Sequence, residues 1–218
     1  MTTLDLNSDH AVAISTGYTA ENKTENMIIS PPNGTETISV QAVNGWIIFQ
    51  QRLSLADNFN YIWEPYKLGF QSSNCSFWLG NEWVHLLTSS GNYKLRMEML
   101  SAAYGWVSAE YTYFLVDSEA NNYTLHVAGY TGDCGDSMAY EGGGGFYDQN
   151  GMGFSTLDGD HDRHVGSVSC AEYRGGGWWY NACFQSNFNG DDDDGMSWYT
   201  LPSPILSITR MMLKKRND

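Results

Sequence analysis

The sequence is poor in charged residues, and above all in basic ones. Only 17% of its 218 residues are charged, and 11 Lys and Arg stand against 25 Asp and Glu, so the formal net charge is -14. Proteins bind nucleic acids and anionic membrane surfaces through clustered Lys and Arg, so neither is an expected partner. The one basic run, Lys214-Lys215-Arg216, lies at the C-terminal end and is interpreted as a solvated tail.

Long apolar runs are also absent. No stretch approaches the roughly 20 apolar residues of a transmembrane helix. The first residues, MTTLDLNSDHAVAIS, lack the basic start and the apolar stretch of a signal peptide. Either the protein is intracellular or the numbering begins after a removed leader, and the cysteines described below favour the second interpretation.

The common fingerprints of catalysis are missing as well. The sequence contains no GxSxG, HExxH, phosphate-loop or dinucleotide motif. His85 and His126 stand in strand-like segments, where a histidine is interpreted as structural rather than as a catalytic base. We therefore expect a protein that is not an enzyme.

Aromatic residues and glycines are abundant. Aromatic residues make up 14% of the chain, and 23 residues are glycines. This composition predicts a folded protein with many turns. Residues 45–52 read as a buried strand, and 93–100, 106–116 and 122–130 alternate between apolar and polar side chains. These patterns predict an α+β fold with a central antiparallel sheet. A short helix is expected within 57–70, ending near Pro65.

The texture of the sequence changes after about residue 130. The following segment is rich in Gly, Asp and aromatic residues and has little aliphatic periodicity. Because it contains Trp178 and Trp179, we expect a folded, loop-built unit of the kind that carries binding sites. The expected single domain of residues 1–218 then comprises an N-terminal part, a central sheet, a loop-rich part and a C-terminal strand with its tail. Their respective ranges are 1–43, 44–130, 131–205 and 206–218.

Three aspartates alternate with other residues in the stretch TLDGDHDRHVG, at Asp158, Asp160 and Asp162. Ca²⁺ takes six to eight oxygen ligands, which such a loop can supply. The loop is not an EF-hand, because that motif needs Gly and Glu where this sequence has Arg163 and Ser169. A solvated acidic turn remains the alternative. Zinc is not expected at the nearby histidines, His161 and His164, because no Cys or Glu falls at ligand spacing.

The chain has four cysteines, which can pair in three ways. They are Cys75, Cys134, Cys170 and Cys183. An even number without a CxxC spacing favours two disulfides and hence an oxidising, extracellular compartment. Four N-x-S/T sequons agree with secretion and make the chain a candidate glycoprotein. They begin at Asn22, Asn33, Asn74 and Asn122.

Seven segments follow one another in an order that is typical of one family. They are NGWIIFQQR, FWLGNEWVHLLT, YKLRMEM, GDCGDSM, GFSTLDGDHD, CAEYRGGGWWYNACFQSNFNG and SITRMMLKK. Together they resemble the fibrinogen-related domain, the globular C-terminal module of fibrinogen chains, ficolins, tachylectins and angiopoietins. The resemblance runs from about Asn44 to Lys214. It implies a central antiparallel sheet with short helices and a loop-rich calcium- and ligand-binding subdomain.

The resemblance also implies how the cysteines pair. The family disulfide of the loop-rich part corresponds to Cys170 and Cys183. The usual N-terminal disulfide is missing, since Ala42 takes the place of its second cysteine and no cysteine precedes it. Cys75 and Cys134 are not typical of the family, and the joint loss and gain predicts a bridge between them.

The family template assigns roles to the acidic loop. It implies that the side chains of Asp160 and Asp162 and the backbone carbonyls of His164 and Gly166 bind Ca²⁺. This sequence has about two more residues between the aspartates and Cys170 than the template. The template therefore fixes the two carbonyl ligands less firmly than the two aspartates. The template makes Asp158 a structural hydrogen-bonding residue.

A ligand pocket beside the calcium loop is the second implied site. In lectin-like members it recognises acetyl groups through backbone N–H groups. Here these would belong to Cys183 and Phe184, after a cis peptide bond between Ala182 and Cys183. The expected aromatic wall falls on Arg174, with Tyr173 adjacent.

The last pocket segment departs from the lectin pattern. In a DDDD run, Asp192 stands about where the lectins have a Tyr, and Asp193 about where the peptide-binding pocket of fibrinogen has an Asp. Carboxylates there would suit a cation, such as a peptide amino terminus or an amino sugar. A solvated loop over 191–194 is the main alternative, and the others are a second calcium site and a surface for a basic partner.

Two functions follow from the resemblance. The first is a secreted, calcium-binding lectin for N-acetylated or related glycans, acting in innate recognition or aggregation. The second is a structural or adhesive module that binds an extracellular protein or peptide. Homo-oligomers are a further possibility, since they would supply multivalency.

Overall fold

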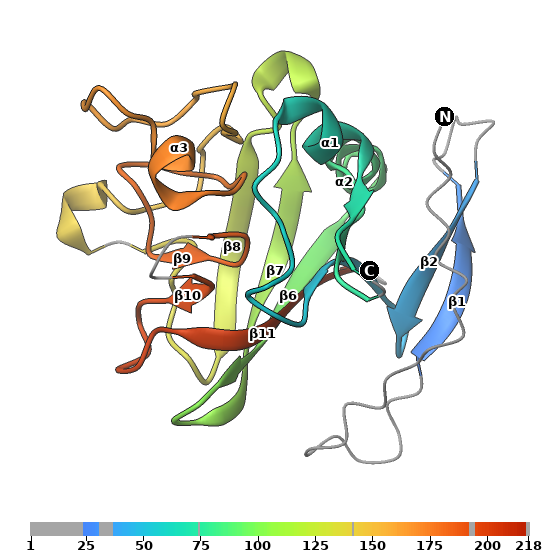
Figure 1. The fold of residues 1–218 in the computed structure, drawn as a ribbon. Helices are drawn as coiled ribbons and strands as arrows, with labels where there is room; N and C mark the ends of the chain where they lie inside the picture. The colour runs from blue at the N-terminus through green and yellow to red at the C-terminus, as the bar shows by residue number, and fades with distance from the viewer. Residues whose placement is uncertain (1–23, 31–36, 74, 141, 192–194, 217–218) are drawn as a thin grey trace.

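The computed structural model describes residues 24–30, 37–73, 75–140, 142–191 and 195–216. Its centre is an antiparallel sheet with the strand order β1-β2-β3-β11-β6-β7-β8, to which β4 and β5 are added beside β3 (Figure 1). The strands are β1 (Thr24–Ile29), β2 (Ile38–Val43), β3 (Trp46–Arg52), β4 (Phe70–Gln71), β5 (Phe77–Trp78), β6 (Tyr93–Ser101), β7 (Gly105–Val116), β8 (Leu125–Gly132) and β11 (Leu206–Lys215). The predicted fold class is thus confirmed.

Strand β6 shows why these segments form a sheet. Tyr93, Leu95, Met97 and Met99 alternate along it, and all four are buried in the main core. Because successive side chains of a strand point to opposite faces, this pattern buries one face. The residues between them, such as Lys94, point to the opposite face, which we call the outer face.

Strand β11 lies in the interior of the sheet, between β3 and β6. It extends to Lys215, and Lys214 pairs with Lys94. The interpretation of Lys214-Lys215-Arg216 as a solvated tail is therefore wrong for its first two residues. They extend β11 along β6, where Lys214 pairs with Lys94 and Lys215 with Tyr93.

Two helices lie together above one end of the sheet, α1 (Trp63–Leu68) and α2 (Asn81–Thr88) (Figure 1). Helix α1 does not end near Pro65, as predicted, but runs through it. Proline is tolerated there because the N–H groups of the first helical turn have no partner within the helix. Among the described residues, no helix has the length and apolarity needed to cross a membrane.

The segment after β8 is built mainly from loops, as predicted. Its regular elements are η2 (Gly143–Gly145), α3 (Cys170–Arg174), β9 (Ser186–Asn187) and β10 (Ser197–Trp198), and η1 (Glu119–Asn121) precedes β8. Trp178 and Trp179 are fully buried, and their rings lie 5.4 Å apart. Their burial in the main core explains how so long a loop region is held in one conformation.

The predicted Cys75–Cys134 disulfide is wrong. Cys75 precedes β5, whereas Cys134 follows β8, and its thiol contacts the carbonyl of Ser108 in β7 at 3.3 Å. Four strand steps separate β3 from β8, or roughly 19 Å at the usual strand spacing. A disulfide needs Cα atoms within about 7 Å. Of the predicted sequons, Asn122 is exposed, and Asn22, Asn33 and Asn74 lie outside the described residues.

Candidate functional site

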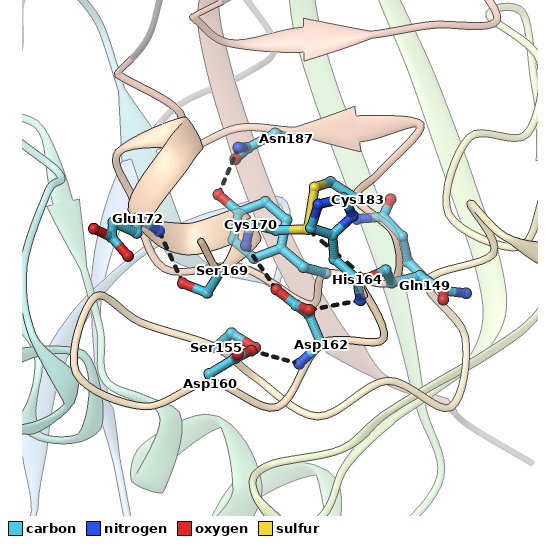
Figure 2. Close-up of a disulfide and its surroundings, with 12 residues drawn as sticks. Gln149, Ser155, Asp160, Asp162, His164, Ser169, Cys170, Glu172, Cys183 and Asn187 are labelled. Carbon is cyan, nitrogen blue, oxygen red and sulfur yellow. Dashed lines mark hydrogen bonds between the residues drawn. A yellow bond between two sulfur atoms is a disulfide. The ribbon is translucent and has the colours of Figure 1, made fainter. Parts of the chain in front are cut away.

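Asp162 organises the acidic loop through its carboxylate. One oxygen accepts a hydrogen bond from the N–H of Cys170 at 2.7 Å, and the other accepts from the N–H of His164 at 2.7 Å (Figure 2). Ser169 caps α3, because its hydroxyl accepts from the N–H of Glu172. Asp162 therefore joins the acidic loop to the first residue of α3.

Asp160 lies beside Asp162, and its carboxylate accepts the N–H of Asp162 at 3.1 Å. Partial burial raises the pKa of Asp162, and the neighbouring negative charge of Asp160 adds to this increase. Its two backbone donors act in the opposite direction. Two adjacent carboxylates favour a bound cation, which removes their mutual repulsion. The pair is the donor set of this loop that could hold a hard metal ion.

Asp158 has the structural role that the template implies. Its carboxylate accepts the N–H of Trp63 at 2.7 Å and the hydroxyl of Thr156 at 2.8 Å. The Trp63 ring also contacts that of His161 edge to face, with centroids 5.3 Å apart. These contacts tie the acidic loop to the start of α1.

The disulfide Cys170–Cys183 is present, with Cα atoms 5.5 Å apart, and the peptide bond Ala182–Cys183 is cis (Figure 2). Both features agree with the expectation from the family. The N–H of Ala182 donates to the carbonyl of Phe146 at 3.0 Å. No hydrogen bond within the described parts of the chain uses the N–H of Cys183 or of Phe184. Two backbone donors therefore remain available at this point.

Asn181 is a positioning residue that the sequence interpretation missed. It is 2% exposed, and its side-chain amide donates to the carbonyls of Gly145 and Asp148 at 2.9 and 2.7 Å. Its own carbonyl accepts from the N–H of Arg163 at 3.0 Å. It thus holds three loops together next to the disulfide. The sequence shows only an asparagine two residues before Cys183, and its burial becomes visible in the folded chain.

A pocket of about 520 Å³ opens over the disulfide. Its volume lies within the usual range of ligand sites, roughly 300–1,000 Å³. The described residues that line it are Tyr147, His164, Gly166, Ser167, Val168, Ser169, Cys170, Tyr173, Arg174, Ala182, Cys183 and Phe184. The structure therefore brings together five predicted ligand residues, namely Tyr173, Arg174, Ala182, Cys183 and Phe184. His164 and Gly166 from the acidic loop join the same wall.

One wall of the pocket is aromatic. The Arg174 guanidinium lies over the rings of Tyr173 and Phe184, 4.8 Å from each centroid. Tyr199 contacts Phe184 edge to face, with centroids 5.7 Å apart. Arg174 thus does not replace the expected aromatic wall but extends it, since guanidinium groups stack on aromatic faces.

His164 has a larger role than the sequence predicts, because its side chain lines this pocket. One of its ring nitrogens lies within 4.8 Å of the sulfur atoms of Cys170 and Cys183. Both sulfurs belong to the disulfide and are not thiolates, so the three residues do not form a zinc site.

The acidic run behind the pocket is described only in part. Asp191 is exposed, as a solvated loop residue would be, but its carboxylate also forms an ion pair with Arg52 of β3. Its N–H also donates to the carbonyl of Arg174 at 2.9 Å. Asp192 and Asp193, predicted to contact a ligand, lie outside the described residues.

The disulfide, the cis bond before its second cysteine and the flanking acidic loop agree with comparisons to known proteins. Residues 22–217 match the family model for the C-terminal globular domain of fibrinogen beta and gamma chains. The chain belongs to this family. It is 35% identical over 209 residues to fibrinogen-like protein A of Apostichopus parvimensis, a match that covers 86% of this chain and 71% of that protein.

Other relatives of this fibrinogen-related chain include proteins named as a techylectin, an angiopoietin-related protein and a fibrinogen chain. It is 35% identical to Techylectin-5A of Tachypleus tridentatus (75% of this chain, 59% of that protein) and 43% identical to human angiopoietin-related protein 2 (79% and 35%). The match to the mouse fibrinogen alpha chain spans only 22% of that protein. These relatives are secreted proteins.

Solved structures place the fibrinogen-related chain in the same fold. The fibrinogen-like globe domain of human ANGPTL2 aligns with a TM-score of 0.79 at 33% identity, covering 91% of this chain and 95% of that one. Lamprey fibrin D-dimer, complexed with the peptide Gly-His-Arg-Pro-amide, aligns with a TM-score of 0.80 at 30% identity, covering 89% and 70%. Domains of this family are generally binding modules rather than enzymes.

Proposed function

We propose that the chain is a secreted, calcium-binding lectin module that recognises an acetylated sugar in the pocket over the Cys170–Cys183 disulfide. The observation that carries this proposal is the pair of backbone donors at Cys183 and Phe184. They are adjacent, belong to residues that line the pocket and donate to no described residue. An amide carbonyl is the acceptor that such donors need.

The surroundings of these donors suit the rest of an acetyl group. Ala182, Phe184 and Tyr147 supply apolar surface beside them. The described part of the lining contains no carboxylate, so it offers a positively charged peptide terminus no counter-charge. These features favour the acetylated sugar over an amino terminus.

Calcium supports the pocket from the acidic loop in this proposal. Asp160 and Asp162 supply two carboxylates, and the carbonyls of His164 and Gly166 are the further oxygen ligands that the family implies. Hard oxygen donors of this kind suit Ca²⁺. The ion would offset the repulsion between the carboxylates and hold the loop whose His164 lines the pocket. The chain itself would supply the contacts to the sugar.

A peptide or protein ligand remains the second candidate, because exposed apolar side chains surround the pocket. Phe146, Val165 and Tyr173 are 65%, 101% and 66% exposed. Exposed apolar clusters mark interaction surfaces. The lamprey fibrin D-dimer, whose structure contains the peptide Gly-His-Arg-Pro-amide, supports a peptide as this second kind of ligand.

Calorimetry with matched ligands separates the two. Metal-stripped protein is titrated with Ca²⁺, and then with N-acetylglucosamine, glucosamine and Gly-His-Arg-Pro-amide. The lectin proposal expects calcium-dependent heat with N-acetylglucosamine and none with glucosamine, which lacks the acetyl group. Binding of the peptide alone would instead support the second candidate. If the protein binds Ca²⁺ but neither N-acetylglucosamine nor the peptide, the proposal of an acetyl pocket is contradicted.

A further inference from the structure

The outer face of the sheet gathers basic side chains in a strongly acidic protein. Five of the eleven basic residues lie on or beside it, accompanied by two carboxylates, Glu98 and Glu110. The basic residues are Lys94, Arg96, Arg210, Lys214 and Arg216. Because the whole chain carries a formal charge of -14, this face has the opposite sign to most of the molecule.

An unusual lysine pair lies on this face where β6 begins and β11 ends. Lys94 of β6 and Lys214 of β11 are directly paired across neighbouring strands. Like charges in this arrangement repel and destabilise a sheet. Their ammonium groups lie over the same ring, that of Trp46, at 4.6 and 5.9 Å from its centroid. Glu110 is 4.0 Å from Lys94, too far for a strong hydrogen bond.

Two of the other three basic residues of the face are compensated by carboxylates, and the third, Arg216, donates to the carbonyl of Thr112 at 3.2 Å. Arg210 pairs with Glu98, and Arg96 bridges Glu98 and Glu110. Excess positive charge therefore concentrates at Lys94 and Lys214. The turn before β3 fixes the position of the Lys214 ammonium group, which donates to the carbonyl of Asn44 at 2.8 Å.

We propose that the outer face around Trp46, Lys94 and Lys214 binds a sulfated polysaccharide, independently of the pocket. Converging ammonium groups bind sulfate, and the edge of the indole ring offers apolar surface to a sugar. Repeated charges on a linear chain match basic residues about 5 Å apart on neighbouring strands. The acidic remainder of the protein does not prevent this contact, because charges beyond about 8 Å are screened at physiological salt.

Heparin is the probe that tests this surface, with the full chain applied to immobilised heparin over a salt gradient. We expect retention at low salt and at least tenfold weaker binding by the double variant Lys94→Gln/Lys214→Gln. Each lost lysine contact should make the dependence of affinity on salt shallower by about one unit of log–log slope, as for other polyanions. Lys67→Gln in α1, a helix that packs on the main core and not on the outer face, is the matched control and should bind as the wild type does.

Other outcomes would overturn the proposal. These are a lack of retention by the folded wild type, unchanged binding by the double variant, or equal competition by desulfated heparin or by duplex DNA. Concentration-dependent dimers that the same double variant abolishes would mean that a second copy covers this face. Chelation of calcium and added N-acetylglucosamine should leave heparin binding unchanged. Failure of the pocket proposal is therefore distinguishable from failure of this one.

Discussion

The guanidinium of Arg52 in β3 forms an ion pair with the carboxylate of Asp191, which lies 139 residues later in the chain. Arg52 is fully buried, and it also donates to the carbonyls of Gly190 and Asp57, at 2.6 and 2.9 Å. A buried charge requires such partners. Through them Arg52 connects the sheet to the loop that supports α3 behind the pocket.

Replacing Arg52 should therefore destabilise the protein strongly. We expect Arg52→Met to lower the free energy of unfolding by about 3 kcal/mol, because it breaks a buried pair and leaves backbone carbonyls without donors. Urea denaturation measures this change. Lys67→Met, which breaks the exposed Lys67–Glu119 pair, is the matched control and should lose less than about 1 kcal/mol. Equal losses in both variants would contradict this account of Arg52.

Calcium should stabilise the wild type and not variants of the acidic loop. At a hundredfold excess over its dissociation constant, a ligand adds about 2.7 kcal/mol to stability. We expect thermal denaturation of Asp160→Asn and Asp162→Asn to be insensitive to Ca²⁺. Asp117→Asn, which alters a carboxylate paired with His126, should keep the response. In chelator, Asp160→Asn should be no less stable than the wild type, because a like-charge contact has been removed.

The Cys134 thiol should be unreactive in the folded protein. Burial raises its pKa from 9.0 to about 12, so it remains protonated near pH 8. Since the thiolate is the reactive form, we expect iodoacetamide to modify Cys134 only after unfolding. Peptide mass spectrometry of native and denatured samples gives the comparison. Rapid modification of the native thiol at pH 8 would falsify this expectation.

The same pKa shift predicts the alkaline behaviour of the protein. A thiol with a raised folded-state pKa stabilises the fold fully below its unfolded pKa of 9.0. This contribution should decline as the pH rises from about 9 towards 12, because the unfolded chain then ionises first. The free energy of unfolding of the wild type and of Cys134→Ala, measured at pH 8 and pH 10.5, isolates the contribution of the thiol. The stability difference between them should narrow at the higher pH.

Removing the disulfide should impair the pocket as well as the fold. Cys170 and Cys183 are 13 residues apart, and closing such a loop stabilises a protein by about 3 kcal/mol in the chain-entropy model. We expect the double variant Cys170→Ser/Cys183→Ser to lose about this amount in urea denaturation. It should also lose binding at the pocket under conditions where it remains folded. Heparin binding at the outer face should persist in that folded state.

Much of the sheet was predictable because its signal is local. The alternation of Leu95 and Met97 with polar residues reports a strand with one buried face, whatever its neighbours are. The buried Trp178 and Trp179 likewise marked the loop-rich part as folded. The resemblance supplied the pairing of Cys170 with Cys183, which the local pattern alone left open.

The failures concern relationships between distant segments. The Cys75–Cys134 bridge was inferred from the joint loss of one cysteine pair and gain of another, which contains no information on the separation of Cys75 and Cys134 across the sheet. The pairing of Arg52 with Asp191 has no local signature either, since 139 residues lie between them. The place of His164 beside the pocket has no local signature either, because only the folded chain shows that this exposed loop edges a pocket.

The interior position of β11 has a consequence for synthesis on the ribosome. Strands β3 and β6 each have an edge that only residues 206–215 cover, and these residues are translated last among the strands. Until they emerge, both edges display unsatisfied N–H and C=O groups that invite pairing with other chains. A nascent chain must therefore be kept from aggregating until β11 has left the exit tunnel. A premature stop codon anywhere before Leu206 should remove not a tail but the middle of the sheet.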